Sequence, residues 1–182
     1  SAIERDFTFD NSGDATIFGA EIEAKLDLYN KEIDDEKSQN FSFGTNATFM
    51  HTDLKFNTNN TAFNYTGTSS QLEGASPFTI NADLSYKFTN GEKETISTLV
   101  FNYQSDKVYS IGTNFKENII EKAVPILDFV FRHNFNEQIG VKFNAKNLLN
   151  PSFERYRDIP EKLTMNSYKN GLTITAGVSF NF

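Results

Sequence analysis

The sequence has no cysteine and no tryptophan, few prolines, and no apolar run near the ~20 residues of a membrane-spanning helix. Without cysteine there are no disulfides, no thiolate metal sites and no cysteine nucleophile. The missing apolar run excludes a membrane protein built from helices. Acidic residues outnumber basic ones by 24 to 17, and a net charge of −7 argues against a nucleic-acid partner, whose phosphates need neutralising.

Aromatic residues are abundant by contrast. The 19 Phe and 7 Tyr make up 14% of a chain whose mean hydropathy is only −0.48, so large apolar side chains must alternate with polar ones. The 182 residues suffice for one domain or one small closed β-barrel, and are too few for two large domains. Residues 1–6 show neither an initiator methionine nor a signal peptide, so we expect a processed chain or a piece of a longer one.

The alternation has the period of a β-strand. From Gly171 to Phe182 apolar residues take every second position, and Pro77–Phe88 repeats the pattern. A helix would scatter both sets around its circumference. Weaker versions occur at 3–9, 18–28, 41–49, 99–103, 127–135 and 139–145. The sequence predicts an all-β fold of about eight antiparallel strands, many near the ~9–11 residues that a tilted strand needs to cross a bilayer.

Short connections are predicted at one end of the sheet. Thr89–Glu92 contains an Asn-Gly turn signal and 136–138 is equally brief, so each is expected to close a tight hairpin. The connection at 30–39 is longer than the others at this end. An even number of strands would place both chain termini here.

Long polar connections are predicted at the opposite end, at 57–76, 112–124 and 150–170. Within the second, Glu117–Lys122 has the composition of a single helical turn. Short turns at one end and long loops at the other are typical of outer-membrane barrels.

Two architectures differ in where the apolar face points. In a soluble β-sandwich it points into the core, whereas in a membrane barrel it points to lipid and the polar face lines the interior. Aromatics at strand ends favour the membrane, as an interfacial girdle, although they would also close a sandwich core. These aromatics are Tyr86, Phe88, Phe135, Phe180 and Phe182.

Charged residues occupy the opposite, polar faces of the same strands. They are Glu21, Glu23, Lys25 and Asp27 in one segment, and Asp128, Arg132, Lys142 and Lys146 in a later hairpin. This arrangement suits a wet or ion-paired barrel interior, and it also suits a solvated face of a soluble sheet.

Three motifs follow one another in a familiar order. Asn11–Glu23 contains Asn-x-Gly-x-Ala and then Gly-x-Glu at the head of a long strand. Val141–Phe153 contains Asn-Leu-Leu-Asn before a segment with an aromatic, and the last strand ends on Phe182. In this order, across nearly the whole chain, the motifs resemble the C-terminal β-barrel portion of TonB-dependent outer-membrane receptors.

Members of that family are barrels of 22 strands with a plugged lumen. The resemblance implies that residues 1–182 form one unit, the last strands of an up-and-down transmembrane β-barrel, without the plug and the earlier strands. It implies the cell outer membrane of a Gram-negative bacterium and import of a scarce nutrient with energy from an inner-membrane complex. The barrel-assembly signal would be Phe180 and Phe182.

The partners that the resemblance implies are outer-membrane lipid, the remaining strands and plug of the same receptor, and the TonB complex acting through that plug. A surface lipoprotein is a further candidate. The resemblance leaves the cargo open among iron chelates, cobalamin, glycans and peptides.

Catalytic and metal-binding motifs are missing. His51 and His133 lie on separate predicted strands without further ligands at metal-binding spacing, so we predict no metal and no cofactor. Glu21 and Glu23 point the same way, but such pairs occur on any solvated strand, and we expect no enzyme.

A ligand would meet the protein at the long-loop end. The loop residues best able to stack on or pair with a solute are Tyr65, Phe115, Phe153, Arg155, Tyr156 and Arg157, and packing of the loops is their alternative role. Three other functions stay open: a self-contained eight-stranded outer-membrane barrel, structural or adhesive; a soluble β-sandwich binding module; and an outer-membrane enzyme.

Overall fold

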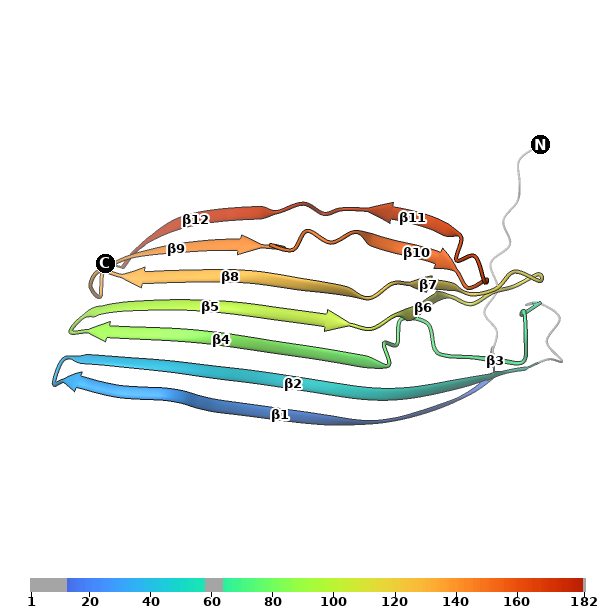
Figure 1. Cartoon of the computed structure of the whole chain (residues 1–182), viewed down its shortest axis with the longest axis horizontal. Coiled ribbons are helices and arrows are strands. Elements are labelled where there is room, and N and C mark those ends of the chain that lie inside the picture. The colour runs from blue at the N-terminus through green and yellow to red at the C-terminus, as the bar shows by residue number, and fades with distance from the viewer. Residues whose placement is uncertain (1–12, 58–63, 182) are drawn as a thin grey trace.

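The structure is an antiparallel β-sheet one layer thick (Figure 1). The computed structural model describes residues 13–57 and 64–181. Their regular secondary structure is all β-strand, so the predicted all-β antiparallel fold is confirmed. The strand predicted at 3–9, like Phe182, lies outside the described residues. In the described ranges no helix is long and apolar enough to cross a membrane.

Most strands belong to one eight-stranded sheet. They are β1 (Gly13–Asp34), β2 (Lys37–Phe56), β3 (Ser69–Ser70), β4 (Phe78–Asn90), β5 (Lys93–Gln104), β8 (Val124–Asn134), β9 (Ile139–Lys146) and β12 (Thr173–Phe180). They lie in the order β1-β2-β4-β5-β8-β9-β12, with the short β3 beside β2. Every neighbouring pair is antiparallel, so the chain runs up and down across the sheet.

A four-stranded sheet extends the first one at its long-loop end. Its strands are β6 (Lys107–Ser110), β7 (Ile119–Glu121), β10 (Phe153–Arg157) and β11 (Thr164–Tyr168), in the order β11-β10-β7-β6. In the chain β6 follows β5 and β7 precedes β8, while β10 follows β9 and β11 precedes β12. The two sheets are therefore two levels of the same antiparallel strands (Figure 1).

Asparagine and aspartate side chains hold the break between the two levels. The Asp106 carboxylate accepts a hydrogen bond from the main-chain N of Ala123 at 2.7 Å, which ties the β5–β6 break to the β7–β8 break. At the next break, Asn147 donates its main-chain N–H to Asp128 at 2.8 Å and its amide to the Gly171 carbonyl at 2.7 Å. Asn147 has a φ of 60°, a left-handed conformation that asparagine tolerates better than most residues.

The register places apolar residues opposite one another from edge to edge of the sheet. One row of directly opposed residues is Leu26, Phe43, Leu84, Leu99, Phe129, Ala145 and Ile174. The next row belongs to the other face and is Asp27, Ser42, Ser85, Thr98, Val130, Asn144 and Thr175. Because side chains alternate along each strand, the sheet has one apolar and one largely polar face.

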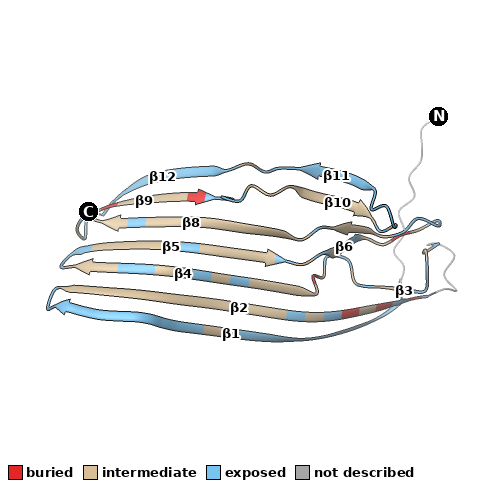
Figure 2. Ribbon diagram, in the orientation of Figure 1, coloured by how far each residue is buried: buried red, intermediate tan, exposed pale blue. Residues whose placement is uncertain are grey.

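Neither face is covered by a second layer of the described residues. Phe49 and Leu99 belong to strands with neighbours on both sides, yet they are 51% and 40% exposed. The buried apolar side chains are Leu54, Phe56, Val108 and Ala145, and most of the sheet is half-buried or exposed (Figure 2). A soluble domain of this length would bury far more apolar area.

The two predicted hairpins are confirmed. Gly91 and Glu92 join β4 to β5, with Asn90 opposite Lys93, and the φ of 57° at Gly91 explains why glycine takes the first central position. The turn after β8 is closed by Asn136, whose carboxamide oxygen accepts from the main-chain N of Ile139 at 2.7 Å.

The long connection predicted at 30–39 is wrong. β1 continues to Asp34 and β2 begins at Lys37, so the turn has only two residues. The Asp34 carboxylate accepts from the main-chain N of Glu36 and from the Lys37 ammonium, at 3.1 and 2.9 Å. The bond to Lys37 holds the pKa of Asp34 below its ordinary value. The dense charges at 31–37 concealed the strands because they interrupt the apolar alternation there.

Two further predictions are wrong at the long-loop end. Glu117–Lys122 forms no helical turn, because Ile119 and Ile120 are β-branched and belong to β7, which pairs with β6 and β10. The stretch 150–170 is no continuous loop, because it contains the paired strands β10 and β11. At the short-turn end, β12 finishes with Phe180 opposite Ile139, where the sequence predicts the C-terminus.

Substitutions of Asn147 test how the break between the two levels of the sheet is held. In Asn147→Gly the backbone keeps its positive φ but loses the bond to Gly171, so we expect unfolding to become easier by about 1 kcal/mol. Asn147→Ala adds left-handed strain and should cost about 2–3 kcal/mol in total. Urea unfolding of the full-length protein, followed by circular dichroism, measures both. Equal losses would show that the backbone conformation at this position contributes nothing.

Candidate functional site

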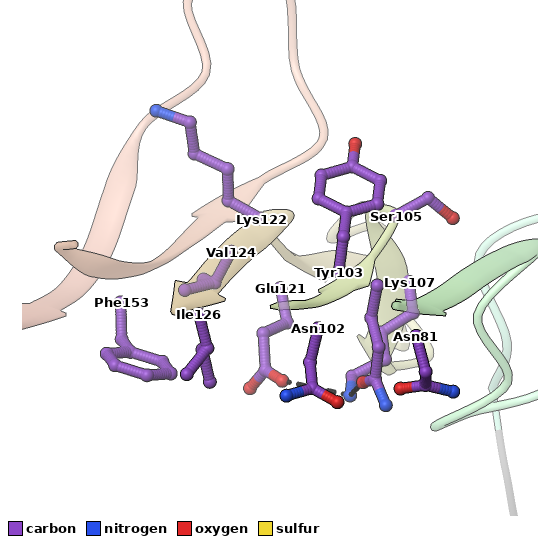
Figure 3. Close-up of a pocket in the computed structure, with 11 residues that line it drawn as sticks. Asn81, Asn102, Tyr103, Ser105, Lys107, Glu121, Lys122, Val124, Ile126 and Phe153 are labelled. Carbon is purple, nitrogen blue, oxygen red and sulfur yellow. Dashed lines mark hydrogen bonds and ion pairs between the residues drawn. The ribbon is translucent and has the colours of Figure 1, made fainter. Parts of the chain in front are cut away.

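A groove opens on the polar face where the two levels of the sheet meet. It has a volume of about 210 Å³. Figure 3 shows Asn81, Asn102, Lys107, Glu121, Ile126 and Phe153 pointing to one side, while Tyr103 and Lys122 point to the other. The lining residues come from β4, β5, β6, β7, β8 and β10. The groove is therefore assembled by strand register, from segments far apart in the sequence.

Three asparagines lie side by side on the polar face next to the groove. Asn46, Asn81 and Asn102 are directly opposite one another on β2, β4 and β5. The Asn46 amide donates to Glu21. Within the described part of the chain, the amides of Asn81 and Asn102 have no hydrogen-bond partner. Each leaves a two-hydrogen donor and a carbonyl acceptor toward the groove.

An ion-paired triad forms one wall. Arg155 contacts the Glu121 carboxylate through Nε and one terminal nitrogen, each 2.8 Å from a carboxylate oxygen. The Lys107 ammonium lies 3.3 Å from the other oxygen of the same carboxylate. The Arg155 guanidinium also lies 3.5 Å from the centre of the Tyr109 ring. All three charged side chains are about one-quarter exposed.

The triad sets the charge state of its acid. Partial burial acts to raise the pKa of Glu121, but the bonds from Arg155 and Lys107 outweigh it and hold that pKa below its ordinary value. The same contact raises the pKa of Arg155. Glu121 therefore stays ionised at neutral pH, and its charge is neutralised within the wall.

Tyr156 supports the groove from the opposite face. Its hydroxyl donates to Asp106 at 3.0 Å, on the carboxylate that also holds the main chain of Ala123. Burial, together with the bond and charge of Asp106, raises the pKa of Tyr156 to about 12. The phenol stays protonated and serves as a donor, which fixes β10 against the break between the levels.

Of the six predicted loop residues, Phe153 lines the groove, and it stacks on Tyr168 with ring centres 5.3 Å apart. Arg155 does not line the groove but is ion-paired with Glu121, which does. Tyr156 faces the other way. Arg157 donates to the Glu117 carbonyl at 2.8 Å.

The other two predicted residues lie away from the groove. Tyr65 stacks on Phe56 with ring centres 4.2 Å apart. Phe115 is 91% exposed in the loop before β7, with a positive φ. Both belong to the loops at the long-loop end, and neither lines the groove.

The groove residues that sequence reasoning missed include Asn81, Asn102, Lys107 and Glu121. Alternation does place Asn81 on the polar face of its strand. The missing information was the register, which sets Asn81 opposite Asn102. For Glu121 the predicted helical turn concealed its strand, and with it the pairing to Arg155.

The two histidines occupy separate strands, as the sequence indicates. His51 packs against Phe18 with ring centres 5.0 Å apart, and His133 shares a 2.8 Å hydrogen bond with Thr95. In the ranges that the structure describes, no three His, Cys, Asp or Glu side chains converge as metal ligands.

The polar face carries further charge nearer the short turns. Arg132 and Lys142 are directly opposite on β8 and β9. Neither forms an ion pair with another described residue, although two like charges side by side repel one another. Water or another polypeptide segment must therefore lie against this part of the face.

Comparison with known proteins identifies no relative: the chain matches no family model, no curated protein and no solved structure.

The triad predicts a specific pH dependence. Because folding lowers the pKa of Glu121, its stabilising effect is full above the pKa of the unfolded chain and is lost as the pH falls through the lowered folded value. At pH 7 we expect Glu121→Gln to cost about 1 kcal/mol, and the difference from wild type should shrink in acid. Urea unfolding of the full-length protein at several pH values measures this.

Glu154→Gln is the matched control, because Glu154 pairs with Lys122 at 3.0 Å on a more exposed surface. Its cost should stay near the ~0–1 kcal/mol of surface pairs. A loss for Glu121→Gln that does not change with pH would contradict the triad.

Proposed function

We propose that this chain is part of the wall of a transmembrane β-barrel in the outer membrane of a Gram-negative bacterium. The barrel is a TonB-dependent receptor that imports a scarce nutrient, and the chain is its C-terminal portion. One observation carries the proposal: the apolar face is continuous from β1 to β12, and no described segment covers it. A bilayer supplies the cover that this face requires.

The height of the apolar face supports a bilayer. On β4 it extends from Phe78 to Phe88, about 34 Å along the strand at ~3.4 Å per residue. With a tilt of about 40°, it is about 26 Å tall, close to the ~25 Å apolar band of outer-membrane barrels.

Aromatic side chains mark both ends of this band. At the long-loop end Phe49, Phe78 and Tyr103 are neighbours, with ring centres 4.9 and 6.2 Å apart. At the short-turn end lie Tyr86 and Phe135, both exposed. Two rows of aromatics are what the two interfaces of a membrane select.

The edges of the sheet favour a wide barrel over a closed eight-stranded one. Among the described residues, β1 and β12 are not paired with each other. β1 alone leaves an edge of 22 residues. Lipid does not tolerate unpaired backbone groups, so further strands of the same protein complete the wall. A β-sandwich has no support, because the described sheet is one layer thick.

The polar face then lines the interior, where a nutrient would pass. The groove lies on this face toward the long loops, which in outer-membrane barrels face the medium. In the proposal the plug and its link to the TonB complex belong to the rest of the receptor. Arg132 and Lys142, which lack partners in the described sheet, face that interior.

Site-directed spin labels test the orientation. The chain has no cysteine, so single cysteines introduced at Val178, Phe180 and Ser179 report alone. In lipid vesicles we expect labels at 178 and 180 to be relaxed by oxygen, which concentrates in lipid, and the label at 179 by a water-soluble nickel complex. Water-exposed labels at 178 and 180 would overturn the proposal.

A charged substitution on the apolar face tests the same orientation through its effect on the free energy of unfolding. Leu99 and Leu84 are opposed at mid-height, so Leu99→Arg should destabilise the protein by about 2–4 kcal/mol in a bilayer. Thr98→Arg, one residue away on the polar face, should cost only the ~1 kcal/mol of its hydrogen bond to Ser85. Urea unfolding from vesicles measures the two, and equal effects would place both residues in water.

A further inference from the structure

We infer that the groove binds a short stretch of a neutral oligosaccharide. The inference rests on the proposed function, because it names the class of cargo that this side of the barrel would take. It depends on three features of the groove: amides without partners, an aromatic wall and charges that are already neutralised.

The amides match hydroxyl groups. A sugar hydroxyl both donates and accepts a hydrogen bond, and a carboxamide offers both functions in one group. Asn81 and Asn102 are directly opposed, so their Cβ atoms lie about 5 Å apart and both amides reach the same small ligand. With no other partner among the described residues, they bind a hydroxyl pair without first breaking a protein contact.

The aromatic wall matches the other face of a sugar. One side of the Phe153 ring is occupied by Tyr168, at an interplanar angle of 11°. The ring lines the groove beside Ile126, which adds a further apolar contact (Figure 3). The C–H face of a pyranose is apolar and flat, so it packs on such a ring while its hydroxyl edges point to polar groups.

The charges disfavour an anionic chelate or phosphate. Arg155 directs two nitrogens at Glu121 and its flat face at Tyr109. Lys107 is shared between Glu121 and Gln104, at 3.3 and 3.2 Å. An anion would have to displace Glu121 from both cations, whereas an uncharged ligand leaves the triad intact.

The test measures binding to the full-length protein in detergent by titration calorimetry. The probes are the neutral hexasaccharides of maltose, cellobiose, xylobiose and N-acetylchitobiose type. Ferric citrate and hexaglycine represent an anionic chelate and a peptide. We expect at least one hexasaccharide to bind and the other two probes to fail.

Variants locate the site. Asn81→Leu and Asn102→Leu keep the side-chain volume but remove the amides, and each should weaken saccharide binding about tenfold, as should Phe153→Ala. Asn134→Leu, on the same polar face near the short turns, is the control and should bind like wild type.

Failure of all four hexasaccharides, or saccharide binding that survives the amide and Phe153 variants, overturns the inference. Binding of ferric citrate or hexaglycine that Asn102→Leu abolishes also overturns it, because the groove would then take another class. None of these results changes the oxygen and nickel accessibility expected for spin labels at positions 178 and 179. A failure here is therefore distinguishable from a failure of the proposed membrane orientation.

Discussion

The structure depends on an apolar face that its own described residues leave uncovered. Burial of apolar area is the main force that holds soluble domains together, and here four apolar side chains are buried in the described sheet. What holds the strands in place is the ladder of main-chain hydrogen bonds between neighbours, from β1 to β12. Such a ladder is favourable in a bilayer, where unpaired backbone groups have no water. In the proposed orientation, the exposed side chain of Leu99 and the half-buried side chains of Leu84 and Phe129 would face lipid.

The same sheet has room for a binding site because no second layer of described residues packs on its polar face. Breaks in the strands, held by Asp106 and Asn147, divide it into two levels and let side chains from β5, β6, β7 and β10 meet at one height. On the long-loop side of the break the strands pair again, and β6, β7 and β10 hold the three residues of the Glu121 triad. The groove therefore stands on backbone that is paired on both sides, which fixes the positions of its amides more firmly than a free loop would.

Sequence reasoning reached most of the fold, because period-2 alternation is a strong signal wherever one face is apolar. The strands β4, with Phe78–Phe88, and β12 (Thr173–Phe180) follow the pattern closely, and their hairpins carry glycine or asparagine at the turn. Reasoning failed where alternation is absent: around Asp34, where charges surround a two-residue turn, and at β7, β10 and β11, whose short sequences do not alternate between apolar and polar residues. It failed at the groove for another reason. The partnership of Asn81 with Asn102, or of Glu121 with Arg155, is a property of register between strands, and the spacing of residues along one chain does not contain it.

The central claim is that the apolar face meets acyl chains, and photo-cross-linking tests it most directly. A benzophenone amino acid at Leu84 in the full-length protein, irradiated in a bilayer, should yield lipid adducts by mass spectrometry. The same group at Asp83, one residue along β4 and on the other face, should yield none. An adduct from position 84 to another segment of polypeptide, with no lipid attached, would show that the face is packed inside a protein core and would contradict the account.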